Sequence, residues 1–169
     1  NTIFVSDGSG SLSSVNSAFG GAWVLLSTQT ASNSAYVDFT TAITGAFTTT
    51  YKEYLFEWIN VTSSDDGQNF FFNATIDGTN YNVSKVSSAW WAKHDGGTTE
   101  WVSKTANFGK EDETVDQLLV WGIGNASGEG SSGSMHLYDP AGTTYVKSWI
   151  SKASEKVNTE YPIQTDIQG

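Results

Sequence analysis

The sequence has 169 residues but contains neither cysteine nor arginine. The absence of thiols excludes disulfide scaffolds, thiolate zinc sites, iron–sulfur clusters and cysteine nucleophiles. Eight lysines stand against 18 acidic residues, which gives a net charge of −10 at pH 7. Because nucleic-acid binding needs a basic surface and favours arginine, the composition argues against a nucleic acid as a partner.

Long apolar runs and proline are also scarce. No segment approaches the roughly 18 consecutive apolar residues of a membrane span, so we expect no membrane insertion. The chain holds two prolines and 17 glycines, and serine and threonine are abundant. Such a composition suits short strands joined by turns and suits helices badly.

Aromatic side chains are abundant in the sequence. They make up 14% of the residues and include seven tryptophans, although only 38% of the residues are hydrophobic. So many large rings argue against disorder and predict a core filled by a few big side chains. The length fits one domain better than two.

Candidate strands are segments where apolar and polar residues alternate, or short apolar runs between turn residues. They cover residues 2–6, 22–28, 35–39, 51–61, 68–76, 81–86, 88–94, 98–104, 115–123, 134–138 and 145–150. The longest, residues 51–61, places Tyr54, Phe56 and Trp58 on one face, and its length predicts a position in the centre of a sheet. Turn residues at 63–67 and 77–78 predict hairpins on either side of residues 68–76.

The spacing of these segments predicts an all-β fold, an antiparallel β-sandwich that is jelly-roll-like and has about nine to eleven short strands. We expect residues 1–21 to form an N-terminal arm or irregular lead-in, and residues 22–169 to form a single sandwich domain. Residues 151–157 are expected to form a turn of helix, and the residues after Thr159 a loose C-terminal tail.

Potential catalytic groups are few, and none forms a convincing constellation. Glu53 and Glu57 would lie about 13 Å apart on one strand face, too far for a retaining carboxylate pair. Neither His94 nor His136 has a nucleophile elbow in the sequence to support it. Asp65 and the acidic residue after it are expected to form a turn rather than a calcium loop. The sequence therefore predicts no enzyme, no metal and no cofactor.

The tryptophans are better candidates for a functional surface. Trp90 and Trp91 are adjacent, so on a strand they point to opposite faces, and at least one is expected outside the core. Trp101 follows a polar stretch and is expected to be exposed. Exposed rings beside amide and carboxylate side chains are typical of sugar-binding faces and of docking surfaces. The alternative interpretation is that these rings fill the second sheet or pack against a neighbouring subunit.

Three segments resemble a group of virion structural proteins that are common in marine and cyanobacterial phages. They are residues 21–40 (GAWVLLSTQTASNSAYVDFT), residues 51–70 (YKEYLFEWINVTSSDDGQNF) and the glycine-bounded stretch within residues 121–150 (GIGNASGEGSSGSMHLYDPAGTTYVKSWI). The segments cover nearly half the chain in the same order as in that group.

The resemblance implies a non-enzymatic structural protein on the exterior of a virion, a knob that decorates the capsid. Its expected partner is the major capsid protein or another virion protein. In the lead-in, Ile3, Phe4 and Val5 are candidates for capsid docking, while Trp90, Trp91 and Trp101 are candidates for docking or glycan contact. The alternative is a tail-fibre or head-fibre module, or a carbohydrate-binding domain that recognises a host surface polysaccharide.

Overall fold

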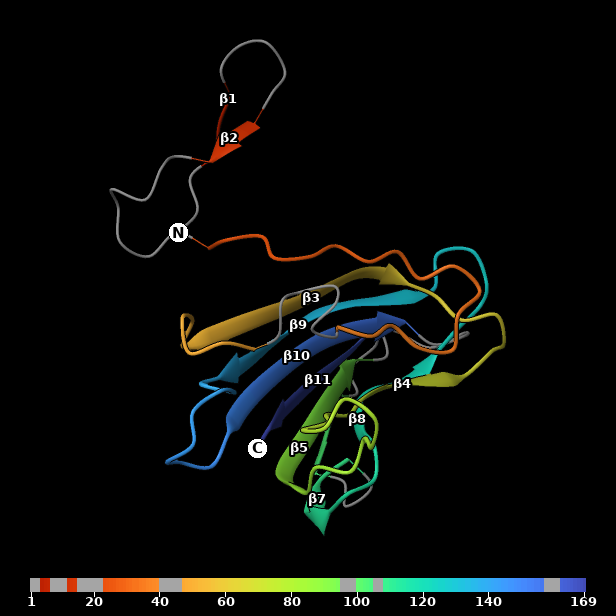
Figure 1. Cartoon of the computed structure of the whole chain (residues 1–169). Helices are drawn as coiled ribbons and strands as arrows, with labels where there is room; N and C mark the ends of the chain where they lie inside the picture. The colour runs from red at the N-terminus through yellow and green to blue at the C-terminus, as the bar shows by residue number, and fades with distance from the viewer. Residues whose placement is uncertain are drawn as a thin grey trace.

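The structure of the protein is a computed structural model that describes residues 4–6, 12–14, 23–39, 47–94, 100–104, 108–156 and 162–169. Eleven strands lie in these residues (Figure 1). They are β1 (Phe4–Ser6), β2 (Leu12–Ser14), β3 (Glu53–Val61), β4 (Gln68–Phe72), β5 (Lys85–His94), β6 (Glu100–Lys104), β7 (Lys110–Glu113), β8 (Gln117–Ile123), β9 (Gly130–Tyr138), β10 (Ser148–Lys156) and β11 (Ile163–Gln168). Within the described ranges, no helix is long and apolar enough to cross a membrane.

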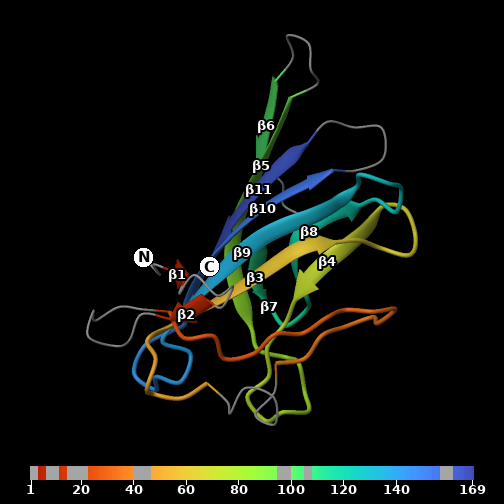
Figure 2. The same ribbon diagram turned by 90° about the horizontal axis from the view of Figure 1, so that it is seen from above.

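The largest sheet has seven strands in the order β3-β9-β10-β11-β5-β6, with β7 paired to the other end of β5. All of these pairings are antiparallel. The strands β4 and β8 form a separate antiparallel pair, and β1 pairs with β2. Figure 2 shows β4 and β8 beside the curved large sheet, and the β5–β6 hairpin projecting past it. The predicted all-β antiparallel sandwich is therefore confirmed.

The core lies between the β4–β8 pair and the inner face of the large sheet. Its buried side chains include Leu118, Val120, Met135 and Trp149, which come from both layers. Rings cross the layer boundary, as Trp58 of the large sheet meets Phe70 of β4 edge to face with centroids 5.4 Å apart. Burying these aromatic and aliphatic side chains supplies the main stabilising free energy of the fold.

Strand β10 shows why a polar sequence lies in the centre of the large sheet. Its residues alternate strictly between exposed and buried, and the buried ones after Trp149 are Ser151, Ala153 and Glu155. Small side chains at the first two positions leave room for β8, which packs directly against β10. The helical turn predicted for residues 151–157 is wrong, because period-two burial overrides the local helix propensity of the lysines and glutamate.

The C-terminal residues also differ from the prediction of a loose tail. Residues 163–168 form β11, hydrogen-bonded between β10 and β5 in the middle of the large sheet. Ile163 and Ile167 are both buried on its inner face. These two isoleucines, four residues apart among polar ones, satisfy the alternation of a strand, and the buried Thr165 between them completes it.

Strand β3 has the predicted faces but not the predicted place. Tyr54 and Trp58 are buried on one face, while Glu57 and Ile59 are exposed on the other. However, β3 lies at the end of the strand order rather than in the centre. A chain segment without strand structure, residues 23–39, runs beside this edge (orange trace in Figure 1).

Residues 23–39, which we call the edge segment, pass from one face of the large sheet to the other around β3. Trp23 packs edge to face on His136, whose ring lies on the outer face, with centroids 6.2 Å apart. Phe39 packs on Phe56, which lies on the inner face, with centroids 5.5 Å apart. The strands predicted at 22–28 and 35–39 are therefore absent from the described part of that stretch, residues 23–39.

Other predicted turns and strands have mixed outcomes. The turn at residues 77–78 is confirmed: Gly78 has a φ of 76°, and the Asp77 carboxylate accepts hydrogen bonds from the backbone N–H groups of Thr79 and Asn80. These hydrogen bonds hold the pKa of Asp77 well below its ordinary value. The hairpin expected to follow is wrong, since residues 81–84 form no strand and β5 begins at Lys85.

Candidate functional site

The large sheet separates the three tryptophans singled out in the sequence. The β5–β6 register pairs Trp91 with Ser103 and Lys93 with Trp101, so Trp91 and Trp101 share one face of the hairpin. This face continues the inner face of the sheet, because Trp91 packs against the core. Trp90 points to the opposite face and is 43% exposed. The expectation that the adjacent rings point in opposite directions is confirmed.

A β-bulge brings a further tryptophan to the same region. Gln68 pairs with Ile123 and Phe70 with Val120, so two residues of β8, Trp121 and Gly122, oppose the single Asn69. A bulge of this kind bends the strand and redirects a side chain. Gly122 adopts a φ of 75°, which glycine tolerates best. The result is that Trp121 is 47% exposed although its neighbours in β8 are buried.

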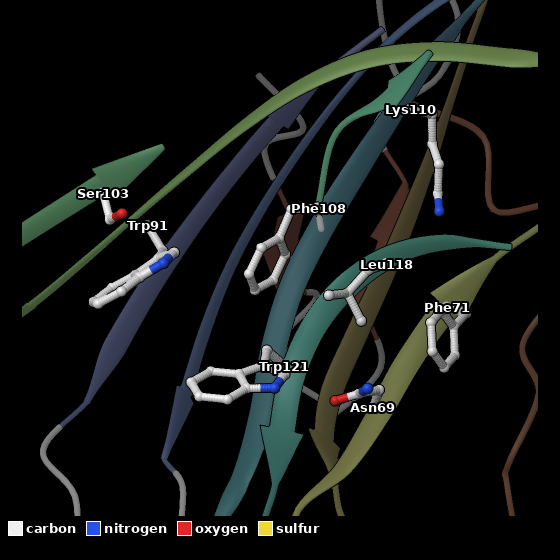
Figure 3. A pocket seen from close by; sticks show the side chains of 8 residues that line it. All are labelled: Asn69, Phe71, Trp91, Ser103, Phe108, Lys110, Leu118 and Trp121. Carbon is white, nitrogen blue, oxygen red and sulfur yellow. The ribbon is translucent and has the colours of Figure 1, made fainter. Parts of the chain in front are cut away.

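The Asn69 side chain completes this bulge. Its Oδ1 accepts a hydrogen bond from the Gly122 N–H at 3.0 Å. The bulge displaces this N–H from the regular ladder, and the side chain supplies the missing acceptor. Asn69 is thereby held beside Trp121 at the surface (Figure 3).

The rings of Trp91 and Trp121 line a hollow of about 460 Å³, which we call the aromatic groove. Its lining comes from five strands and from Phe108, two residues before β7, and is Asn69, Phe71, Trp91, Ser103, Phe108, Lys110, Leu118 and Trp121. In Figure 3 these side chains surround the same space. Phe108 and Leu118 are buried and form its floor, whereas Phe71 and Trp121 are exposed at its rim. Sequence reasoning missed Phe71 and Trp121.

Among the described residues that line the groove, Lys110 is the only charged one. Lys110 Nζ lies 3.3 Å from Glu113 Oε2, and its side chain is 13% exposed. Along the hairpin, Lys93 Nζ lies 5.8 Å from the Trp91 ring centroid and 5.2 Å from that of Trp101. Both distances fall within the range of cation–π attraction. The Lys93 ammonium therefore interacts with both indole rings, and the three side chains form one surface.

Trp101 and Lys93 also line a second hollow, of about 360 Å³, at the β5–β6 hairpin. Trp101 is 40% exposed there, as the sequence predicted. Lys93 and Trp101 share the face of Trp91, but Ala92, Val102, Ser154 and Gln164, which also line the second hollow, point to the face of Trp90. Both hollows are lined in part by the β5–β6 hairpin.

The docking candidates in the lead-in are only partly within the described residues. Ile3 lies outside them. Phe4 and Val5 belong to β1, whose backbone pairs with β2, with Phe4 opposite Ser14 and Val5 opposite Ser13. Their role as docking residues stays a prediction.

The edge segment is a second candidate surface. It exposes a run of apolar side chains, and most are more than two fifths accessible. The side chains above two fifths are Trp23, Val24, Leu25, Leu26, Tyr36 and Val37. Leu25 is the most accessible of the six, at 83%. Trp23 to Leu26 are consecutive in the sequence, and clusters of exposed apolar side chains are characteristic of surfaces that bind a partner.

Two of the four acid–base groups considered in the sequence are partners of each other. His136 Nδ1 contacts Glu53 Oε1 at 2.5 Å on the outer face of the sheet. Glu53 and His136 lie on the strands β3 and β9, away from the aromatic groove. Across the described ranges, no three His, Cys, Asp or Glu side chains are grouped so that they could hold a metal ion.

Comparisons of the chain with protein-family models, with curated proteins and with solved structures find no match.

Proposed function

We propose that this protein is a non-enzymatic structural protein of a phage virion, a knob that decorates the outer surface of the capsid and binds the major capsid protein or another virion protein. The observation that carries the proposal is the exposed apolar edge segment. Its sequence is also the most specific part of the resemblance to phage virion proteins. A knob needs one surface that attaches to the shell, and the edge segment has the character of such a surface.

Charge supports the same proposal. A net charge of −10 keeps identical copies from associating with one another in solution. An apolar strip on such a body binds only a partner that covers it, so attachment is selective for a matching surface. The three apolar residues Val24, Leu25 and Leu26 would make the central contacts, since they follow one another at the start of the segment.

A shell-binding experiment tests this proposal. Shells of the same virion that lack the protein are mixed with wild-type protein or with Leu25→Asp, and the bound fraction is measured after sedimentation. We expect saturable binding by the wild type and at least a tenfold loss for Leu25→Asp, because a buried unpaired carboxylate opposes docking. Leu25 is exposed in the free protein, so the folded state should tolerate the change.

The matched control is Ile76→Asp. Ile76 is even more exposed, at 91%, but it lies in the turn after β4 rather than in the edge segment. It adds the same charge and should bind shells like the wild type. If Leu25→Asp binds as well as Ile76→Asp, the edge segment is not the attachment surface, and if the wild type does not bind at all, the decorating role is wrong.

A further inference from the structure

The aromatic groove is distinct from the edge segment that we propose for attachment. The edge segment borders β3, and the β5–β6 hairpin lies at the other end of the strand order of the large sheet. A protein attached through β3 would therefore leave the hairpin side of the groove uncovered. A surface of that kind is available for a second ligand.

Several aromatic rings line the groove together. Trp121 and Phe71 come from the small sheet, while Trp91 comes from the large one. The bulge at Gly122 and the Asn69 hydrogen bond hold Trp121 outward. A ring held in place before the ligand arrives loses little conformational freedom on binding. The groove is therefore preorganised for a flat, partly apolar ligand.

Polar groups stand beside these rings. They are the Asn69 carboxamide, the Ser103 hydroxyl and the Lys110 ammonium. A pyranose sugar has one apolar face of C–H bonds and a rim of hydroxyl groups. The C–H face packs on an indole, whose π face is electron-rich, and the hydroxyls bond to the neighbouring polar side chains. The combination in the groove matches these two requirements of a sugar.

The charges of the residues that line the two hollows indicate which class of sugar would bind. The chain has 18 acidic residues and eight basic ones, yet among the described residues the only charged one lining each hollow is a lysine, Lys110 in the groove and Lys93 in the second hollow. The Glu113 carboxylate, which forms the ion pair with Lys110, is half exposed. An ammonium group has three donors, so Lys110 can keep Glu113 and still donate to a ligand. The lining is thus locally cationic on an acidic protein.

We propose that the aromatic groove binds an acidic polysaccharide, with a sugar ring stacked on Trp121 and a carboxylate or sulfate of the polymer near Lys110. The polymer would continue along the hairpin over Trp91 toward Lys93 and Trp101. Its negative charge is attracted by Lys110 in the groove and by Lys93, which lies on the same face of the hairpin as Trp91. The binding is a property of the sandwich itself and does not depend on virion attachment.

Calorimetric titration of the purified protein with an oligogalacturonate, and in parallel with a neutral dextran of equal length, tests this inference. We expect the acidic oligomer to bind and to quench tryptophan fluorescence, and its affinity to fall when salt is raised. Trp121→Ala should weaken binding by about tenfold or more, because the stacking surface is lost. Lys110→Gln should weaken it by a few-fold and reduce the salt dependence.

Trp90→Ala is the matched control, since Trp90 is similarly exposed but lies on the opposite face of β5. It should bind like the wild type, and a thermal melt of each variant shows that it remains folded. Equal or tighter binding of dextran overturns the charge selectivity. Binding of neither oligomer, or an equal loss in Trp90→Ala and Trp121→Ala, overturns the site. Because no virion is present, these outcomes are separate from the test of capsid attachment.

Discussion

Replacing Gly133 with alanine is expected to destabilise the folded protein by about 3 kcal/mol. A Cβ at this position would lie within 3.0 Å of the Trp58 ring and of the Lys152 carbonyl oxygen. Neither neighbour can move easily. The Lys152 carbonyl belongs to the backbone of the adjacent strand β10, and the Trp58 indole is fixed by its hydrogen bond to Ser131 Oγ at 3.1 Å.

Urea unfolding of Gly133→Ala measures this loss, and Ser134→Ala provides the control. Ser134 is the next residue of β9 and points to the other face of the sheet, so its change should stay within about 0.5 kcal/mol. A loss below 1 kcal/mol for Gly133→Ala would contradict the close packing of Trp58 over β9 (roughly the lower limit for overpacking). The glycine-bounded stretch that carries part of the resemblance would then have no packing role at this residue.

Replacing Glu155 with glutamine is expected to remove a large pH dependence of stability. Glu155 is 2% exposed; its Oε1 accepts a hydrogen bond from Thr165 Oγ1 at 2.7 Å, and its Oε2 has no partner in the described part of the chain. Burial raises its pKa from an ordinary 4.5 to about 7. Between these two values the folded state binds more protons than the unfolded state, so stability falls as the pH rises.

The size and sign of this effect can be measured directly. At pH 8 the wild type holds a buried charge, and the free energy of unfolding is lowered by roughly 3 kcal/mol relative to pH 4.5 through this group alone. Glu155→Gln keeps the acceptor for Thr165 and never ionises. Its stability relative to the wild type should therefore increase by that amount between pH 4.5 and pH 8.

Denaturant unfolding at several pH values tests the expectation, with Glu57→Gln as the control for the loss of one charge. Glu57 lies on the exposed face of β3. Glu57→Gln removes the same charge from a solvent-exposed position, so Glu155→Gln is compared with it at each pH. Parallel pH profiles for wild type and Glu155→Gln would show that Glu155 does not titrate in this range.

The strands that the sequence predicted correctly are those whose inward residues are large. In β3, Tyr54 and Trp58 mark the buried face, and β8 is an almost unbroken apolar run. Strand β10 carries Ser151, Ala153 and Glu155 inward after Trp149, and in β11 the polar Thr165 separates the two inward isoleucines. Small or polar inward residues weaken the hydrophobic alternation, and the close packing of β8 on β10, which favours small residues there, exists only in the folded protein.

For the edge segment the error is the opposite one, because strands were predicted where the structure has none. Its apolar run and its alternating stretch have a strand's pattern, yet residues 23–39 form no strand. Hydrophobic periodicity reports which side chains are apolar, but it does not tell whether they are covered by the same chain or by a partner. The exposure of Leu25 favours coverage by a partner.

Only part of the aromatic groove could be predicted from the sequence. The opposite directions of Trp90 and Trp91 follow from the geometry of any strand. The exposure of Trp121 depends on a bulge and on the partner chosen by Gly122 N–H. The neighbouring Gly122, with its positive φ, was the one available signal in the sequence, since a glycine inside a strand pattern often marks a bulge.

Taken with the resemblance, the two surfaces fit a decorating protein that is bound through one edge and exposes another. The edge segment lies beside β3, and the β5–β6 hairpin with Trp101 ends the sheet at its other side. Such an arrangement would place a polysaccharide-binding groove on the outside of a virion, where it meets host surface polymers. We propose attachment as the primary role and glycan contact as a second property of the exposed side.

Copy number in purified virions tests the proposed capsid role most directly. The protein is quantified by mass spectrometry with isotope-labelled peptides, relative to the major shell protein of the same particles. A capsid-decorating knob follows the repeated symmetry of the shell, so we predict copies on the order of hundreds per virion. A few dozen copies or fewer would assign the protein to a tail or fibre instead, and its absence from virions would contradict the structural role altogether.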